Sequence, residues 1–435
     1  MSTIDIYQRR RQDLMHFLKD GIVVLTTSPH QSRNGDVFFQ FRPDSDFYYL
    51  THFPEPEAIA VIIPGRPEGE FLIFCREKDP FKEQWDGHRI GLHGACDQYG
   101  ADEAFPIDEF ENKLPELLDN KDKVYTMMGR YPDFDLDLLN CISEVRSKKR
   151  SGMNAPGEFA DLRHILHEMR VFKSKEEVKL MQKAGGIAAA GHQQAMRATK
   201  PGMFEYQVQA ELEYEFRRGG SEWPAYPSIV AGGKNGCVLH YIENNSILND
   251  GDLLLIDAGA EFDCYASDIT RTFPVNGRFS GEQKALYDVV LNAQKASIKK
   301  VHPDATLIEY HDAAVEVLTE GLVDLGILHG EINELIEANA YHPFYMHRTG
   351  HWLGMDVHDV GDYKIDDEWR ILEPGMVLTV EPGLYISPSN NIDPKWHNMA
   401  IRIEDDILVT KTGNENLSNG APKEVSDIEH LMASG

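Results

Sequence analysis

Two aspartates on one predicted hairpin have a spacing that suggests chemistry. The stretch Leu253–Phe273 reads LLLIDAGAEFDCYASDITRTF: an apolar run ending at Asp257, a turn-prone segment, and a second run that carries Asp268. A turn centred between Phe262 and Asp263 would place the two carboxylates opposite each other, with Cβ atoms about 4.5–5.5 Å apart. Such a pair repels by about 4 kcal/mol at an effective dielectric of roughly 20. We therefore expect either a shared proton or a bound cation between them.

A histidine-rich segment and two later strands supply the other candidates. Residues 341–359, YHPFYMHRTGHWLGMDVHD, contain four histidines, and Thr349–Gly350 indicate a loop or irregular strand there. Glu381 ends an apolar run, and Glu404 lies in AIRIEDDILV on the same predicted face as Arg402. The candidate ligands are Asp257, Asp268, His351, Glu381 and Glu404.

Four carboxylates and one imidazole, without a thiolate, make a hard, oxygen-rich set of metal ligands. This set suits two divalent ions, Mn²⁺ or Co²⁺ first and then Zn²⁺, bridged by carboxylates and a solvent oxygen. Two cations would neutralise the repulsion at the hairpin, and a bridging water would lose a proton near neutral pH and become a hydroxide nucleophile. The H-E-x-x-H pattern of helical zinc proteases does not occur in the chain. The spacing predicts a dinuclear metallohydrolase.

Length and composition limit the class of protein. A chain of 435 residues is long for a single core, so we expect two domains. With 42% hydrophobic and 26% charged residues it is typical of a soluble globular protein, and no apolar run approaches the roughly 18 residues of a membrane helix. The net charge of −28 argues against a nucleic-acid surface. Five scattered cysteines and a start without an apolar signal segment predict a cytoplasmic protein.

The elements that must position the candidates fall into two regions, with a boundary expected near Phe172. In residues 1–172, predicted strands at 21–26, 58–63, 70–74 and 123–127 alternate with amphipathic helices. Strands that alternate with helices predict an α/β domain with a partly parallel sheet.

Residues 173–435 follow a different pattern. Ser174 and Glu177 form a capping box that should open a helix reaching about Met196. Helices near 204–219, 281–300 and 305–325 separate strand-rich blocks at 228–241, 252–273, 376–386 and 401–410. Runs of strands between helices favour an α+β domain with an antiparallel sheet, and the candidate carboxylates lie in these blocks.

The same residues resemble a known family. The order Asp, Asp eleven residues later, His, Glu, Glu is that of the five ligands of the pita-bread metallopeptidases, which include methionine aminopeptidase, prolidase and aminopeptidase P. The aminopeptidase P branch is similar to this chain in IDAGAEFDCYASDITRTFPVNG, HRTGHWLGMDVHD, LEPGMVLTVEPGLYI and IRIEDD, and also in NGCVLHYIENN and FFQFRPDSDFYYLTHFPEPEA. The resemblance covers nearly the whole chain.

The resemblance implies a fold and a reaction. The fold is a creatinase-like α/β N-terminal domain, 1–172, followed by an α+β pita-bread catalytic domain with a curved antiparallel sheet, 173–435. The reaction is release of the N-terminal residue from peptides with proline in second position, by attack of a hydroxide that bridges two metal ions, Mn²⁺ first and otherwise Co²⁺ or Zn²⁺. A homo-oligomer, dimer or tetramer, is also implied.

The resemblance assigns roles to individual residues. Glu381 would both bind metal and pass a proton to the leaving proline nitrogen, and His358 and His240 would stabilise the tetrahedral oxyanion. Arg402 would help to hold Glu404 and lower its pKa. The substrate-binding residues implied are His347, Tyr385, Arg402, Tyr226, Trp85 from a neighbouring subunit, and Arg150 at the substrate tail.

Two alternatives remain at this stage. Prolidase has the same fold but acts on Xaa-Pro dipeptides, and a pita-bread module that has lost its metals could bind peptides without catalysis. The presence of all five ligands disfavours the second alternative and also the creatinase-like branch, which lacks the metal ligands. The metal, the preferred first residue, the oligomer size and the physiological peptides do not follow from the sequence.

Overall fold

The computed structural model describes residues 3–18, 21–389 and 391–434. The chain divides into two compact units, Met1–Met169 and Arg170–Gly435. The division lies close to the boundary expected near Phe172. No helix within the described ranges is long and apolar enough to cross a membrane.

The N-terminal unit is built on a mixed sheet. Its described strands lie in the order β6-β5-β4-β1-β7-β8. The central strand β1 pairs antiparallel with β4 and parallel with β7, and β5–β6 and β7–β8 are also parallel. This is the partly parallel α/β sheet that the alternation of strands and helices predicted. The strands are β1 (Gly21–Thr26), β4 (Ile59–Ile62), β5 (Phe71–Cys75), β6 (Glu103–Pro106), β7 (Lys123–Thr126) and β8 (Glu158–Asp161).

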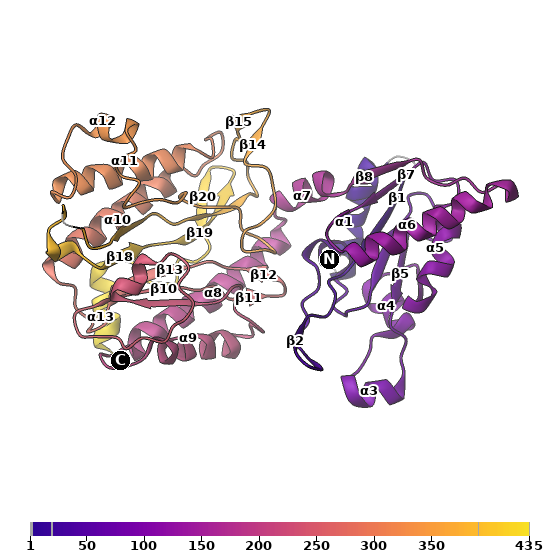
Figure 1. The fold of residues 1–435 in the computed structure, drawn as a ribbon, viewed down its shortest axis with the longest axis horizontal. Helices are drawn as coiled ribbons and strands as arrows, with labels where there is room; N and C mark the ends of the chain where they lie inside the picture. Colours follow the sequence, from indigo (N-terminus) through magenta and orange to yellow (C-terminus); the bar gives the residue numbers. More distant parts are fainter. Residues whose placement is uncertain (1–2, 19–20, 390, 435) are drawn as a thin grey trace. The chain divides into compact units, whose positions relative to one another are not determined.

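Strands of the N-terminal unit that are buried were easier to predict from the sequence than strands that are partly exposed. The predicted strands β1, β4 and β5 are apolar runs buried along nearly their whole length, whereas β6 and β8 are part-buried or exposed and were not predicted. The helices of this region, drawn from indigo to magenta in Figure 1, are α1 (Thr3–Phe17), α2 (Ser45–Thr51), α3 (Pro80–Asp86), α4 (Gly91–Tyr99), α5 (Phe110–Leu118), α6 (Pro132–Ser147) and α7 (Arg163–Val171); a short hairpin joins β2 (Ser32–Asn34) to β3 (Val37–Phe38).

The second unit begins its long helices with the predicted capping box. The Ser174 hydroxyl accepts a hydrogen bond from Glu177 N, and the Glu177 carboxylate accepts one from Ser174 N. The helix that follows continues to Ala198, as predicted within two residues. The helices are α8 (Lys175–Ala198), α9 (Glu205–Gly219), α10 (Gly281–Lys300), α11 (Glu309–Asp324), α12 (Ile332–Glu337) and α13 (Val425–Ala433).

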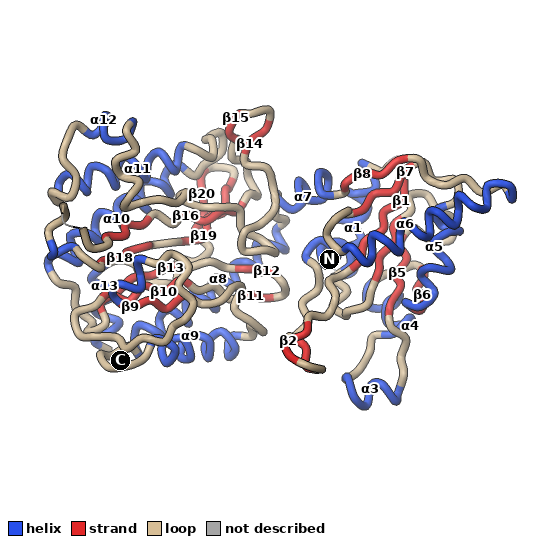
Figure 2. The backbone as a smooth tube through the Cα atoms, viewed as in Figure 1, coloured by secondary structure: helices blue, strands red, loops and turns tan. Residues whose placement is uncertain are grey.

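The strands of this unit lie between two helix pairs. Figures 1 and 2 show α8 and α9 on one side of the strands and α10 and α11 on the other, and one large apolar core joins these helices to the strands. All the strand pairings in this unit that the structure describes are antiparallel, which confirms the predicted α+β class. The strands are β9 (Ile229–Gly232), β10 (Leu253–Asp257), β11 (Glu261–Phe262), β12 (Tyr265–Ala266), β13 (Thr270–Pro274), β14 (Lys364–Ile365), β15 (Glu368–Trp369), β16 (Val377–Val380), β17 (Gly383–Ile386), β18 (Met399–Arg402), β19 (Asp405–Thr410) and β20 (Gly413–Asn416).

The hairpin exists, but its predicted register is wrong. Asp257 pairs with Thr270 and not with Asp268. The turn is centred one residue later than predicted, between Asp263 and Cys264, which have φ angles of 52° and 63°. Two-residue hairpin turns of this kind need positive φ at both central positions, and Asp263-Cys264 is not the Asn-Gly or Asp-Gly pair that would reveal such a turn. The pairing shifts by two residues, so both aspartates still lie on the same face.

Candidate metal centre

The candidate ligands lie at the ends of strands and in one loop. Asp257 is the last residue of β10, Asp268 lies between β12 and β13, and Glu381 directly follows β16. Glu404 lies between β18 and β19, and His351 lies in the irregular segment before β16. Strand ends carry these groups out of the apolar core while the strands themselves stay anchored in it.

The five side chains converge. His351 Nε2 lies 3.4 Å from Asp268 Oδ2 and 3.7 Å from Glu381 Oε1. Ligand atoms of Asp268, His351 and Glu404 all lie within 4.8 Å of one another. The Tyr226 hydroxyl bridges the two aspartates of the hairpin: it lies 2.6 Å from Asp257 Oδ1 and also contacts Asp268 Oδ1. The structure thus brings together all five predicted ligands.

Backbone contacts fix the direction of His351. Its Nδ1 donates to Trp352 O over 2.9 Å, which leaves Nε2 to face the carboxylates. The segment that contains Thr349 and His351 is joined to the end of β16 by two backbone hydrogen bonds. Thr379 N donates to His351 O and Glu381 N donates to Thr349 O, over 2.9 and 2.7 Å. Two ligands are therefore held on one backbone ladder.

A glycine permits this close approach. A β-carbon at Gly350 would lie 1.9 Å from Thr379 O, so the loop and the strand could not come together with a larger residue there.

Arg402 contacts Asp257 directly and Glu404 only through Thr270, and its charge lowers the pKa of Glu404 against the effect of burial. Its Nη2 donates to Asp257 Oδ2 over 2.6 Å and its Nη1 donates to the Tyr385 hydroxyl over 2.8 Å. Its link to Glu404 runs through the Thr270 hydroxyl, which accepts from Arg402 Nε at 3.1 Å and donates to Glu404 Oε2 at 2.6 Å. Thr270 can make this link because the register of the hairpin places it beside Asp257.

The site holds more negative charge than its own cations neutralise. Burial, together with the charges of Asp268 and Asp257, raises the pKa of Glu381 to about 7, although the charges of His351 and Arg402 oppose this shift. Burial and then the charges of the other carboxylates raise the pKa of Glu404 well above its ordinary value. Burial alone would lower the pKa of His351, but its hydrogen bond to Asp268 and the charge of Glu381 raise it to about 9. Divalent cations would relieve this repulsion, so the residues present fit a metal centre.

The histidine near Arg402 is held neutral. Burial, and then the charge of Arg402, lower the pKa of His347 to about 3. His347 Nδ1 donates to Arg348 O over 2.8 Å, and its Nε2 accepts from the Tyr385 hydroxyl over 2.9 Å. Since both nitrogens are used, His347 offers a bound molecule mainly the face of its ring. Tyr385 is 2% exposed, so it lies behind His347 and orients it.

The other two predicted histidines lie at the opening of the site. The His358 ring stands edge-on to the His351 ring with centroids 4.4 Å apart, and burial followed by the charge of His351 lowers the pKa of His358. His240 is exposed and lines the same pocket as His358. An imidazole N–H in this position can donate a hydrogen bond to an oxygen that gains negative charge.

The site opens into a pocket of about 440 Å³. All five candidate ligands, Tyr226, Arg402 and the three predicted histidines line it. Its remaining walls include the apolar side chains Pro227, Ile229, Leu239, Ile242 and Val357. The volume and the mixture of apolar walls with a few converging polar groups are typical of a small-ligand site.

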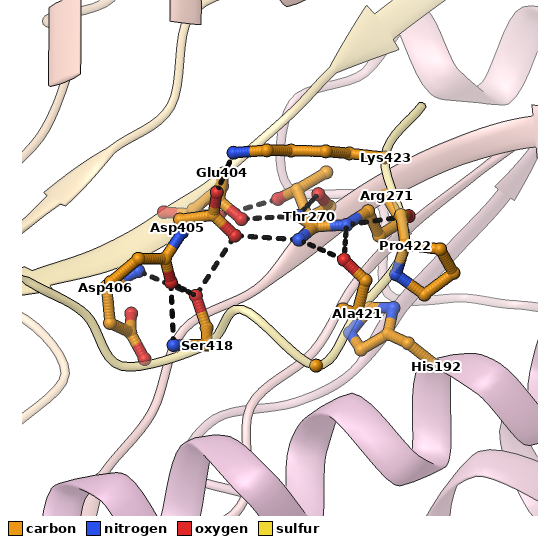
Figure 3. Close-up of polar contacts among 12 residues, drawn as sticks. His192, Thr270, Arg271, Glu404, Asp405, Asp406, Ser418, Ala421, Pro422 and Lys423 are labelled. Carbon is orange, nitrogen blue, oxygen red and sulfur yellow. Dashed lines mark hydrogen bonds and ion pairs between the residues drawn. The ribbon is translucent and has the colours of Figure 1, made fainter. Parts of the chain in front are cut away.

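Several supporting residues were not predicted. The backbone N of Asp268 donates to both carboxylate oxygens of Asp406, over 3.1 and 3.2 Å. Thr270 is fully buried, and Figure 3 shows it beside Glu404. Sequence reasoning missed both because their roles depend on which strands meet in space; the acidic pair after Glu404 was the only signal.

A buried acid holds the segment that carries His240. Glu205, the first residue of α9, is fully buried. Its carboxylate accepts hydrogen bonds from Asn235 Nδ2, the Tyr241 hydroxyl and Ser246 N, over 2.9, 2.7 and 2.9 Å. The pattern of the sequence around α9 does not mark this acid as anything other than a helix start.

Trp85 and Arg150 belong to the N-terminal unit. Trp85 is 78% exposed on the short helix α3, whose residues are all at least partly exposed, and Arg150 is exposed after α6. Their predicted contacts with substrate stay predictions.

Comparison with known proteins gives concordant findings over the whole chain. The sequence pattern of metallopeptidase family M24 matches residues 179–411, and that of the aminopeptidase P N-terminal domain matches residues 7–125. The Xaa-Pro aminopeptidase of Escherichia coli (strain K12) is 44% identical over 428 residues, which are 98% of this chain and 97% of that protein.

Solved structures agree in fold. The Pseudomonas aeruginosa aminopeptidase PepP is 54% identical and superposes with a TM-score of 0.99, covering 100% of this chain and 98% of its own. The zinc-substituted E. coli aminopeptidase P in complex with product is 43% identical, with a TM-score of 0.97 over 100% of this chain and 99% of that one.

Proposed function

Since the chain belongs to metallopeptidase family M24 and carries the N-terminal domain of aminopeptidase P, we propose that it is an Xaa-Pro aminopeptidase. It releases the N-terminal residue from peptides with proline in second position. The observation that carries this function is the convergence of Asp257, Asp268, His351, Glu381 and Glu404 at the base of a pocket with His347 in its wall.

These five residues would hold two divalent metal ions. When bound, the ions supply a Lewis acid for the scissile carbonyl and water of lowered pKa as the nucleophile. Four carboxylates favour a hard cation, so we propose Mn²⁺ as the native metal, with Co²⁺ and Zn²⁺ as the alternatives to be tested.

Glu381 moves the proton. Its carboxylate faces the pocket, and its Oε1 also contacts Thr379 Oγ1 at 3.4 Å, so it has a fixed position and a partly solvated face. From there it takes the proton of the attacking water and passes it to the nitrogen of the leaving proline. One carboxylate can both accept this proton from water and donate it to the proline nitrogen, because both transfers occur over a short distance within the same pocket.

His358 and His240 stabilise the reacting carbonyl. Both line the pocket, and His358 is kept neutral at physiological pH by the burial and the neighbouring charge that lower its pKa. A neutral imidazole N–H donates to the oxygen as it gains charge, without drawing a carboxylate away from the metals.

The wall near His347 accounts for proline. The His347 ring has both nitrogens hydrogen-bonded, and Arg402 and Tyr385 hold it in place from behind. A flat ring without a free donor packs against the pyrrolidine of proline, which has no N–H to satisfy once acylated. Tyr226 holds Asp257 and Asp268 at the floor of the same pocket.

The remaining parts of the proposal concern Trp85, Arg150 and the location of the protein. We propose that Trp85 of a neighbouring subunit closes the site in a dimer or tetramer, and that Arg150 meets the tail of the substrate. The exposure of Trp85 supports this proposal. A cytoplasmic location is proposed because all five cysteines are free thiols.

The test compares four peptides with the same first residue. After removal of metal with a chelator, Xaa-Pro-Yaa, Xaa-Pro, Xaa-Ala-Yaa and acetyl-Xaa-Pro-Yaa are incubated with and without Mn²⁺, and release of the first residue is measured. Metal-dependent cleavage of Xaa-Pro-Yaa well above the other three supports the proposal. Preference for the dipeptide would instead identify a prolidase, and no cleavage with any divalent metal would identify a binding module.

A further inference from the structure

Glu404 is held at three points by two consecutive residues of β13. Glu404 N donates to Thr270 O over 3.1 Å, and its Oε2 accepts from the Thr270 hydroxyl over 2.6 Å. Its backbone carbonyl accepts from Arg271 Nη1 over 2.6 Å. Both the backbone and the side chain of this candidate ligand are therefore fixed by the floor of the hairpin.

Arg271 uses all its donors at this position. It is fully buried and is not among the residues that line the pocket, and Figure 3 shows its guanidinium between residues 404–406 and the C-terminal segment, residues 418–423. Its Nη2 donates to Asp405 Oδ1 and to Ala421 O over 2.7 and 2.8 Å, and its Nε donates to Pro422 O over 3.1 Å. Burying a guanidinium without partners costs a large amount of free energy. These contacts therefore allow only one arrangement of β13, residues 404–406 and residues 418–423.

Asp405 neutralises Arg271 and links it to the surface. Asp405 Oδ2 accepts from Lys423 Nζ over 2.5 Å and from Gln294 Nε2 over 2.8 Å, while Ser418 donates to Oδ1 over 3.0 Å. The Lys423 side chain is 21% exposed, whereas Asp405 is completely buried. A continuous series of charged hydrogen bonds thus runs from a partly exposed lysine to the backbone of a candidate metal ligand.

We propose that Arg271 and Asp405 are positioning residues that set the metal affinity of the site by fixing Glu404, and that Lys423 of the C-terminal segment tunes this affinity from a distance. A ligand that is already in place loses less conformational freedom when the metal binds, so a fixed Glu404 binds more tightly than a mobile one. This inference rests on the proposed metal centre.

The experiment titrates the full-length, metal-free chain with Mn²⁺ alone and measures Kd by calorimetry, with the electron paramagnetic resonance signal of bound Mn²⁺ as a second readout. In Asp405→Asn the Kd should rise by about 10- to 100-fold, the usual range for residues that orient a ligand. In Lys423→Met, which keeps the length of the side chain, the rise should be smaller, about 3- to 10-fold, because Arg271 still neutralises Asp405.

A matched control separates positioning from general stability. Lys295 pairs over 2.6 Å with Glu424, the residue after Lys423, and both side chains are more than 40% exposed. Lys295→Met should leave the Kd for Mn²⁺ unchanged. If Asp405→Asn does not fold, Lys423→Met still decides the question, because its charge is at the accessible end of the network.

The outcomes are distinct. A parent protein that binds no Mn²⁺ would overturn the proposed metal centre and this inference with it. A parent that binds Mn²⁺ while Lys423→Met and every folded Asp405 variant keep Kd within twofold of it, even with a lower unfolding temperature, would overturn this inference alone. A higher Kd and an altered resonance signal in the variants, with Lys295→Met unchanged, would support it.

Discussion

Metal binding should tighten as the pH rises from 7 to about 9, because His351 must lose a proton before it can bind a metal ion. In the metal-free site burial opposes the charged imidazole, but the hydrogen bond to Asp268 and the charge of Glu381 raise the pKa of His351 to about 9. Only the neutral imidazole is a metal ligand, so proton and metal compete for Nε2.

The magnitude follows from the distance between the pKa and the working pH. Each pH unit below the pKa of His351 is worth about 1.4 kcal/mol, so at pH 7 the proton opposes metal binding by about 3 kcal/mol, or roughly 100-fold in Kd. The same pKa shift also determines how the contribution of His351 to the stability of the metal-free fold changes with pH. The folded-state pKa lies above the ordinary value of about 6.5, so the protonated His351 stabilises the metal-free fold fully below that pH, and this stabilisation is lost as the pH rises through about 9.

Calorimetric titration with Mn²⁺ at pH 7, 8 and 9 measures this effect. We expect Kd to fall by at least tenfold per pH unit, because Glu381 and Glu404, whose pKa values are also raised, lose protons on metal binding together with His351. At least one proton should be released at pH 7 when two buffers of different ionisation enthalpy are compared. The control is His358→Gln, which should keep the slope because the lowered pKa of His358 leaves that ring neutral throughout the range. A Kd that does not change with pH, without proton release, would refute the assignment of His351 as a protonated group in the metal-free site.

Three substitutions test the rest of the site. Asp268→Asn removes a carboxylate that faces His351 and should reduce peptide hydrolysis by roughly 100-fold or more; near-normal turnover would contradict its role as a ligand. Arg402→Lys replaces a guanidinium that contacts Asp257, Thr270 and Tyr385 with a single ammonium group, and kcat/KM for Xaa-Pro-Yaa should fall by about 10- to 100-fold. An unchanged kcat/KM would show that charge alone suffices. Gly350→Ala places a β-carbon 1.9 Å from Thr379 O and should lower the free energy of unfolding in urea by about 2–4 kcal/mol, whereas Gly281→Ala, where a β-carbon meets no atom within 4 Å, should be close to neutral. Equal stability of the two alanine variants would contradict the close approach of the loop to β16.

Elements with a strong local signal could be predicted from the sequence. The capping box at Ser174 begins α8, and the buried apolar runs of β1, β4 and β5 form strands, because these patterns depend on residues close together in the chain. The edge strands β6 and β8 lack such a run, and their pairing with β5 and β7 is what makes them strands. Their formation depends on neighbours that the local pattern does not contain.

The limit of sequence reasoning is clearest at the hairpin. The chain could be read as two runs joined by a turn, but the position of the turn depends on Asp263 and Cys264 adopting positive φ, which neither residue type requires. That one-residue error placed Asp268 opposite Asp257, where the structure has Thr270.

The sequence by itself determined the chemistry: four carboxylates and one imidazole without a thiolate, a ligand set that suits hard divalent cations. Only the tertiary structure decided how these groups are held. The contacts of Thr270 with Glu404, of Arg271 with Asp405, and of Tyr226 with both aspartates join segments that are far apart in the chain. Residue types determine which atoms can bind a metal, but hydrogen bonds have a direction and a short range, so the partner of each ligand is settled only when the strands have met.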